Sequence, residues 1–242
     1  MQDLEKINLL DGSFYDYHYY DDPEALVGYK GYSEASINPT LVDLAMVLFQ
    51  PKSCLDLGCA KGYYVKAFRD RGVNAWGVDF SKYAIENAPE EISRYLFCMD
   101  ALKFCEDRPF RVGMPSKKVK FSLIFMQDLL EHLPIINGGK LIEKMIGVGE
   151  NVFTCFAALP EIDDPRREQF EEEWQNAPEH VNMVAWNVWE EIFKDSHIPY
   201  FVIYTLRFGH WDKDTIVYRS SFPLNSEIFG PAWDAFLATL PG

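Results

Sequence analysis

The 242-residue chain contains no apolar run that approaches the roughly 20 residues needed to cross a membrane. Its N-terminal residues are acidic and aromatic, without the cationic start and apolar block of a signal peptide. It also has no internal repeat and no low-complexity tract, which excludes repeat arrays and disordered chains. We therefore expect a globular protein with neither a transmembrane helix nor a signal peptide.

Positive charge and cysteine are both scarce. The 23 basic residues stand against 37 acidic ones, a formal charge of -14, which argues against a protein that grips nucleic acid by its phosphates. The five cysteines include no C-x-x-C pair, which argues against a disulfide framework or a zinc knuckle. We interpret them as small core side chains of a protein from a reducing compartment, the cytoplasm.

The chain does contain a regular alternation of short apolar runs and amphipathic stretches. The runs predict strands at 53–57, 75–79, 95–99, 121–126, 151–156, 200–206 and 215–219. Continuous apolar strands separated by helices indicate a parallel sheet covered on both faces. The last two runs are separated by only eight residues, too few for a helical crossover, so we expect them to pair antiparallel. The predicted fold is a doubly wound, Rossmann-like α/β fold whose seven-stranded sheet ends in an antiparallel strand, with helices on both faces.

A glycine-rich loop follows the first predicted strand. It reads Asp-Leu-Gly-Cys-Ala-Lys-Gly over residues 56–62, and Asp79 ends the next strand 21 residues after Gly58. Such glycines let the backbone approach a ligand closely, and the second acid can accept both ribose hydroxyls, which indicates a nucleoside cofactor. The third glycine of a dinucleotide fingerprint is absent, and Asp56 would repel a phosphate but suit an ammonium group. These features favour S-adenosylmethionine (SAM) over NAD.

With this motif the chain resembles class I SAM-dependent methyltransferases, in the branch of the ubiquinone-biosynthesis-type and small-molecule O-methyltransferases. The loop matches the D-x-G-x-G-x-G motif of that family with Ala60 in place of the middle glycine, and Asp100-Ala101 matches the pair that meets the adenine. Residues 121–134 match the motif that faces the methionine part of SAM. The cofactor-binding residues implied by the resemblance are Asp56, Gly58, Ala60, Gly62, Asp79, Phe80, Asp100, Ala101 and Gln127.

The resemblance implies a methyltransferase domain over residues 39–220. Residues 1–38 precede it and are rich in aromatics, which predicts either a lid over a ligand or a helix and loop packed on the sheet edge. An acidic insertion at 160–180 follows a strand, where open α/β sheets bind ligands, and residues 221–242 form a C-terminal extension.

Carboxylates and histidines gather after the fourth predicted strand. Asp128, Glu131 and His132 would share a face within one helical turn, and His180 follows the fifth strand. The group resembles the E-x-x-E-H motif, with a distant histidine, that binds a divalent metal in small-RNA 3′-terminal 2′-O-methyltransferases. It implies all four residues as ligands of Mg²⁺, Mn²⁺ or Zn²⁺. Two alternatives stay open: His132 or His180 is a metal-free base, or the group is structural.

The sequence thus predicts a SAM-dependent methyltransferase (EC 2.1.1.-) with His132 and His180 as catalytic residues. We expect O-methylation of a small polar acceptor, such as a sugar or a hydroxylated metabolite, with no membrane and no nucleic acid as partner. The alternatives are an N- or carboxyl-methyltransferase, an RNA 3′-end 2′-O-methyltransferase, and a SAM-binding protein without activity.

Overall fold

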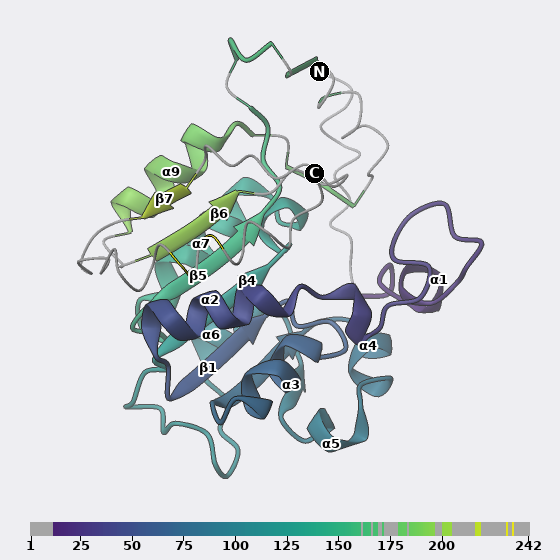
Figure 1. Ribbon diagram of the computed structural model, residues 1–242, viewed down its shortest axis with the longest axis vertical. Coiled ribbons are helices and arrows are strands. Elements are labelled where there is room, and N and C mark those ends of the chain that lie inside the picture. Colours follow the sequence, from purple (N-terminus) through teal and green to yellow (C-terminus); the bar gives the residue numbers. More distant parts are fainter. Residues whose placement is uncertain are drawn as a thin grey trace.

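The computed structural model describes residues 12–160 and, further along the chain, residues 162–165, 167–168, 171, 179–182, 184–196, 200–204, 216–218, 231 and 234. Most of the expected insertion at 160–180, and all but two residues of the expected C-terminal extension, lie outside the described residues. The described elements form a twisted sheet between two layers of helices (Figure 1).

The strands form one seven-stranded sheet in the order β3-β2-β1-β4-β5-β6-β7. All neighbouring pairs run parallel except β6 and β7, which pair antiparallel with Val202 opposite Val217. The order reverses between β1 and β4, which is where open α/β sheets bind ligands. The strands are β1 (Ser53–Leu57), β2 (Asn74–Asp79), β3 (Leu96–Cys98), β4 (Leu123–Gln127), β5 (Val152–Phe156), β6 (Tyr200–Tyr204) and β7 (Ile216–Tyr218).

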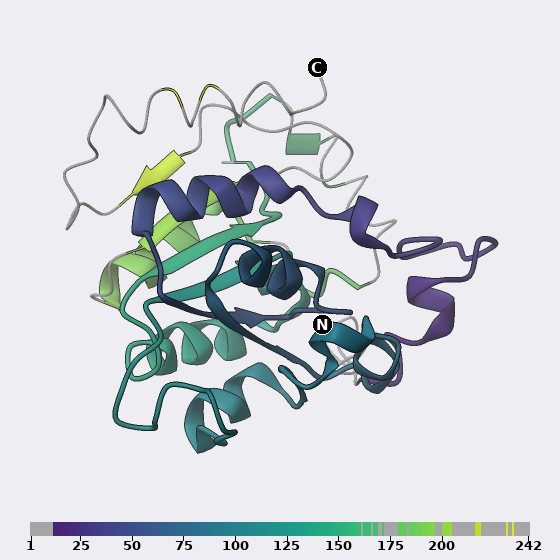
Figure 2. The same cartoon turned by 60° about the horizontal axis from the view of Figure 1, so that its bottom comes forward.

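Helices cover both faces of the sheet, as the two views in Figures 1 and 2 show. One face is covered by α2 (Pro39–Phe49) and α3 (Tyr63–Asp70). The other is covered by α6 (Ala101–Asp107), α7 (Ile135–Met145) and α9 (Trp186–Asp195). The shorter helices are α1 (Tyr17–Tyr20), η2 (Glu34–Ser36), α4 (Lys82–Glu86), α5 (Glu90–Ser93) and η3 (Leu130–His132).

Successive residues of the central strands pack into opposite layers. Cys54 and Phe125 belong to the core beneath α2 and α3, whereas their neighbours Leu55 and Ile124 belong to the core beneath α6, α7 and α9. Because both layers are dry, each strand is apolar on both faces and reads as a continuous apolar run. This confirms the doubly wound α/β fold.

The ends of several elements follow from single residues. The hydroxyl of Ser81 accepts the N–H of Ala84 at 3.0 Å and caps α4, as its position before the helix predicts. Cys98 departs from the expectation of a core cysteine, because it ends β3 at the edge of the sheet and is exposed. The other four cysteines are buried.

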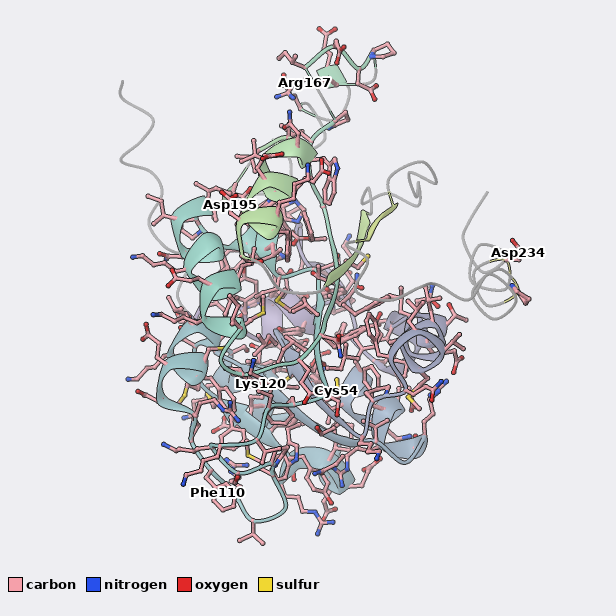
Figure 3. The ribbon with its side chains drawn as sticks, turned by 90° about the vertical axis from the view of Figure 1, so that its left-hand side faces the viewer. Cys54, Phe110, Lys120, Arg167, Asp195 and Asp234 are labelled. Carbon is pink, nitrogen blue, oxygen red and sulfur yellow. The ribbon has the colours of Figure 1, made fainter. Side chains whose placement is uncertain are left out.

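Figure 3 labels side chains from both ends of the molecule. Arg167, which follows β5, and Phe110, which precedes β4, lie at opposite ends of the molecule. No helix in the described part of the chain is long and apolar enough to cross a membrane.

Candidate active site

The loop at residues 58–62 turns back over the end of β2. The N–H groups of Gly58 and Cys59 both donate to the carbonyl oxygen of Val78, at 2.8 and 3.1 Å. Gly62 closes the loop with a φ of +82°, and a Cβ there would come within 2.7 Å of a packed side chain, so only glycine fits. Because α3 begins at the next residue, its first N–H groups lie at the loop.

Asp79 is held at the end of β2 by the backbone around it. Its Oδ2 accepts the N–H of Ala60 and its Oδ1 accepts the N–H of Ser81, both at 2.8 Å. Burial raises the pKa of Asp79 to about 6, although the two backbone hydrogen bonds oppose that shift. Each oxygen keeps a second lone pair, so the carboxylate can still accept hydroxyl groups from a ligand.

A cavity of about 370 Å³ opens at the carboxyl ends of the strands. Seven of the nine residues predicted to bind the cofactor line it: Gly58, Ala60, Asp79, Phe80, Asp100, Ala101 and Gln127. The other two do not: Asp56 is buried within β1, and Gly62 packs against Ile92. The structure therefore gathers most of the predicted cofactor residues around one space.

Two buried oxygens near the loop are acceptors without a hydrogen-bond partner among the described residues. They are Oδ2 of Asp56 and Oε1 of Gln127, and Gln127 lines the cavity. Burial, and then the charge of Asp79, raises the pKa of Asp56 well above its usual range. Such unsatisfied acceptors are costly in a folded protein unless a ligand supplies the missing donor.

Tyrosines line part of the cavity and pack against Ala60 of the glycine loop. We call residues 15–32 the tyrosine segment; it follows the start of the described chain and lies beyond α4 (Figure 1). Five of its tyrosines line the cavity: Tyr15, Tyr19, Tyr20, Tyr29 and Tyr32. All but Tyr29 are buried, packed mostly edge to face against one another.

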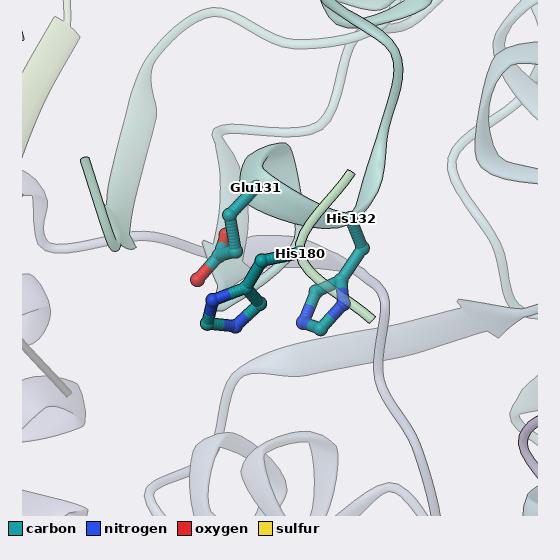
Figure 4. Close-up of side chains that lie close together, drawn as sticks. All are labelled: Glu131, His132 and His180. Atoms are coloured by element: carbon teal, nitrogen blue, oxygen red, sulfur yellow. The ribbon is translucent and has the colours of Figure 1, made fainter. Parts of the chain in front are cut away.

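Glu131, His132 and His180 form a cluster, the Glu-His group, beside the cavity (Figure 4). One side-chain ligand atom from each lies within 4.8 Å of the others, and the two imidazole rings are 5.0 Å apart between centroids. Of the three, His132 lines the cavity itself. The structure thus brings together residues that are widely separated in the sequence, as predicted.

Asp128, the remaining residue of the predicted set, does not belong to the Glu-His group among the described residues. The expected shared helical face is wrong, because the chain forms only the 3-10 turn η3 here and Asp128 precedes it with a φ of 47°. Its N–H donates to the carbonyl oxygen of Cys155 at 2.8 Å, and the residue lines the cavity separately.

Backbone hydrogen bonds bring His180 to η3. The N–H groups of Val181 and Asn182 both donate to the carbonyl oxygen of Glu131, at 3.0 and 3.3 Å. The side-chain amide of Asn182 donates to the carbonyl oxygens of Leu130 and Leu133, at 2.8 and 3.0 Å. The segment that carries His180 is therefore clamped to η3 by both backbone and side chain.

The contacts of His132 decide which ring nitrogen carries the proton. Nδ1 lies 3.0 Å from the carbonyl oxygen of Glu179 and 3.1 Å from the hydroxyl of Tyr15. Because a carbonyl oxygen only accepts, Nδ1 must donate, and the neutral ring then has its lone pair on Nε2. Glu131 is held as well, because its Oε1 accepts the N–H of Ala157 at 3.0 Å.

Sequence reasoning missed Tyr15 and Asn182. Tyr15 touches the Glu-His group from 117 positions away, and Asn182 acts through backbone carbonyls rather than through a recognisable motif. Only the aromatic richness of the N-terminal residues pointed toward the first, and no local pattern pointed toward the second.

A family model described as a methyltransferase domain matches residues 29–201, more than half of the chain. The chain belongs to this methyltransferase family. It is a SAM-dependent methyltransferase, EC 2.1.1.-, and the cavity at the glycine loop lies within the matched residues apart from the start of the tyrosine segment. A methyltransferase of this kind needs SAM and an acceptor.

Solved structures are similar to this methyltransferase in fold. A SAM-dependent methyltransferase from Archaeoglobus fulgidus has 13% identity over 87% of this chain and 88% of its own, with a TM-score of 0.56. The plantazolicin methyltransferase BpumL, solved in complex with S-adenosylhomocysteine (SAH), has 16% identity over 84% of this chain and 77% of its own, with a TM-score of 0.50. No curated protein sequence matches the chain.

Proposed function

We propose that this methyltransferase transfers the methyl group of SAM to a hydroxyl oxygen of a small polar acceptor, and that the Glu-His group handles that hydroxyl. One observation carries the proposal: the cavity lined by most of the predicted cofactor residues is also lined by His132. A methyl donor and an acceptor hydroxyl can therefore meet in one enclosed space, which is the main requirement of methyl transfer.

In this proposal the nine predicted residues hold the cofactor. Asp79 accepts the ribose hydroxyls, and Asp100-Ala101 meets the adenine. The buried Oε1 of Gln127 is an acceptor in need of a donor, which the ammonium group of the methionine part would supply. Asp56 offers its buried Oδ2, an acceptor, directly before the loop. The set in full is Asp56, Gly58, Ala60, Gly62, Asp79, Phe80, Asp100, Ala101 and Gln127.

In the metal-free form of the reaction, His132 is the base. An acceptor oxygen attacks the methyl carbon in line with the carbon–sulfur bond, whose electron pair stays on sulfur to give SAH. The proton of the acceptor hydroxyl passes to Nε2 of His132, the nitrogen that the Glu179 carbonyl leaves with the lone pair. His180 lies beside it, with 5.0 Å between the ring centroids.

The Glu-His group also fits a divalent metal. One carboxylate and two imidazoles lie at ligand spacing, and hydrogen bonds to Ala157 and Glu179 hold two of them in place. Two nitrogen donors favour Mn²⁺ or Zn²⁺ over Mg²⁺. When bound, such an ion would lower the pKa of an acceptor hydroxyl. Glu131, His132 and His180 would then serve as ligands. Asp128 lies outside this group and would not bind the ion directly.

Calorimetric titration of chelator-treated protein tests the cofactor and the metal separately. SAM should bind and NAD should not, and Mn²⁺ or Zn²⁺ should give a heat that His180→Ala removes. The control is His18→Ala, because His18 has a side chain that is 75% exposed and lies outside the cavity. If SAM binds but no metal gives a heat of binding, the mechanism in which His132 acts as a metal-free base is favoured. If SAM does not bind, the proposed cofactor placement is wrong.

Transfer of labelled methyl from SAM to an acceptor panel tests the hydroxyl. We expect turnover with hydroxylated acceptors and a loss of about 10²–10⁴ in kcat for His132→Ala. Turnover only with amines or carboxylates, with His132→Ala nearly as active as the wild type, would instead favour an N- or carboxyl-methyltransferase.

We further propose that residues 1–38 act as a lid on a domain that spans 39–220, with 221–242 as an extension. The described part of the lid, residues 12–38, includes the tyrosine segment, five of whose rings line the cavity.

A further inference from the structure

Lys61 of the glycine loop points away from the cofactor cavity and is almost fully buried. Its Nζ lies 2.6 Å from both carboxylate oxygens of Asp21 and 3.2 Å from the carbonyl oxygen of Tyr32. The side chains of Lys61 and Asp21 are 7% and 25% exposed. The cofactor loop is therefore joined to the tyrosine segment by an ion pair shielded from water.

Asp21 has a second partner. Its Oδ2 accepts the hydroxyl of Tyr83, from α4, at 2.7 Å. Asp21 is the C-cap residue of α1, so the ion pair fixes the point within the tyrosine segment where α1 ends and the following loop begins. Three elements that are distant in sequence, namely α1, the glycine loop and α4, meet at one carboxylate.

The tyrosine segment is one unit that the ion pair can hold. The N–H of Tyr29 donates to the carbonyl oxygen of Tyr19, and the N–H groups of Gly31 and Tyr32 donate to that of Tyr20, at 2.7 to 2.8 Å. Gly28 permits the fold-back, because its φ is +91° and a Cβ would lie 2.1 Å from the carbonyl oxygen of Tyr19. Lys61 contacts Asp21 near the start of this folded-back loop and Tyr32 at its end, so it holds both ends of the loop.

A lysine in this loop has an electrostatic consequence. SAM carries a sulfonium and an ammonium, so a lysine aimed at the cavity would repel it. Lys61 instead pairs with Asp21, and removal of the carboxylate would leave the lysine charge buried and unpaired, which is strongly unfavourable. Removal of the lysine would leave Asp21 partly exposed, with only the Tyr83 hydroxyl as a side-chain partner among the described residues. Neither residue of the pair lines the cavity, but Lys61 contacts the carbonyl oxygen of Tyr32, which does, so the pair reaches the cavity through the tyrosine segment.

We propose that Lys61 and Asp21 are positioning residues that retain the cofactor: the pair holds the tyrosine segment over the cavity, and cofactor leaves when this pair opens. The inference rests on the proposed cofactor placement between the glycine loop and the tyrosine rings. It adds to the cofactor site Asp21, which lies outside the methyltransferase motif, and Lys61, which occupies a variable position within it.

The test is the rate at which labelled SAM leaves the full-length protein when excess SAH is added. Lys61→Met and Asp21→Asn should each speed release by on the order of tenfold or more. The double variant should be no more than about twofold faster than the faster single variant, because the two residues act as one pair. Lys194→Met is the matched control, because Lys194 pairs with Glu190 and Glu191 of its own helix α9 and does not line the cavity. It should change release less than twofold.

A second measurement keeps the inference testable if Lys61→Met does not fold. Tyr83→Phe removes one hydrogen bond to Asp21 and leaves both charges paired; it should speed release by about two- to fivefold. In ligand-free protein, amide exchange of Tyr29, Gly31 and Tyr32 should rise in the same variants.

The outcomes separate the two proposals. Release rates within twofold of the wild type in Lys61→Met and Asp21→Asn would overturn the retention by this pair, whatever the amide exchange shows. A wild-type protein that binds no SAM would overturn the cofactor placement, and the inference with it.

Discussion

Ala60 adopts a left-handed backbone conformation, with a φ of 49°, in the middle of the cofactor loop. Glycine reaches this region without strain, whereas alanine loses about 1–2 kcal/mol there. The position is fixed from both sides, because the N–H of Ala60 donates to Asp79 and the next residue is Lys61 of the ion pair. The loop holds a strained residue at the point where it meets the cofactor cavity.

We expect Ala60→Gly to raise the free energy of unfolding by up to about 1 kcal/mol, since the relief of strain exceeds the extra entropy of an unfolded glycine. Urea unfolding measures it. Ala67→Gly, within α3, is the control and should lower stability by about 1 kcal/mol or more. Equal losses in the two variants would contradict the strain.

Asp79 has a pKa of about 6 in the folded protein, raised from 3.8 by burial. The folded chain therefore binds this proton more tightly than the unfolded chain, and the group's contribution to stability is present below about pH 4 and lost as the pH rises through 6. Cofactor binding has the opposite preference, because ribose hydroxyls need an ionised acceptor.

The affinity for SAM should be constant above about pH 7 and weaken toward tenfold per pH unit below 6. Titration calorimetry between pH 5 and 8 measures this. Asp79→Asn should bind about 10–100-fold more weakly at pH 7.5, with a flatter pH dependence. If Asp79→Asn keeps the pH dependence of the wild type, that dependence arises from the titration of another group.

At the scale of elements, α7 and α9 approach each other most closely at one glycine. A Cβ on Gly138 would lie 2.5 Å from a ring carbon of the buried Trp189, whereas a Cβ on Gly139, the next residue, would meet nothing within 4 Å. Two neighbouring glycines in α7 thus have opposite structural roles.

Gly138→Ala should lower the free energy of unfolding by about 1–3 kcal/mol, because the helices must separate or Trp189 must shift. Gly139→Ala should raise it by up to about 1 kcal/mol through helix propensity alone. Thermal or urea unfolding of both variants checks the pair. Similar values for the two would show that α7 and α9 do not pack as described.

The elements also show what the sequence could predict. The strand at 53–57 was predicted to the residue, because all five residues are buried, three of them are apolar, and Gly58 ends the run. The helical turn expected at Asp128 was wrong, because the shared spacing of 128, 131 and 132 fits an α-helix and the chain makes only three residues of 3-10 helix there. Periodicity identifies long elements and fails for a single turn whose shape tertiary contacts decide.

At the scale of the whole molecule, the cavity is assembled from α1, the glycine loop, η3 and the segment around Val181. The sequence motifs identified the cavity residues predicted to bind the cofactor, because these residues lie in short motifs at recognisable spacing. The contact between Tyr15 and His132, and the ion pair of Lys61 with Asp21, were not predictable, because no local pattern specifies which distant side chains meet.

Saturating SAM should stabilise the whole chain. At about 100 times its dissociation constant, a ligand that binds only the folded state adds roughly 2.7 kcal/mol, or roughly 5–10 °C in melting temperature for a chain of this size. Differential scanning fluorimetry measures the shift, with NAD as the control that should give none. A shift with NAD and none with SAM would contradict the assignment of the cofactor.

The contact between Tyr15 and His132 joins residues 117 positions apart, and Val181 lines the same cavity from still further along the chain. On a ribosome that adds roughly 5–20 residues per second, the tyrosine segment emerges about ten seconds or more before the last part of its binding surface. During that interval its rings can pack against residues 60–84 but lack their partners on the Glu-His side. The nascent chain therefore presents a cluster of aromatic side chains to chaperones, and the catalytic cavity is among the last features of the molecule to form.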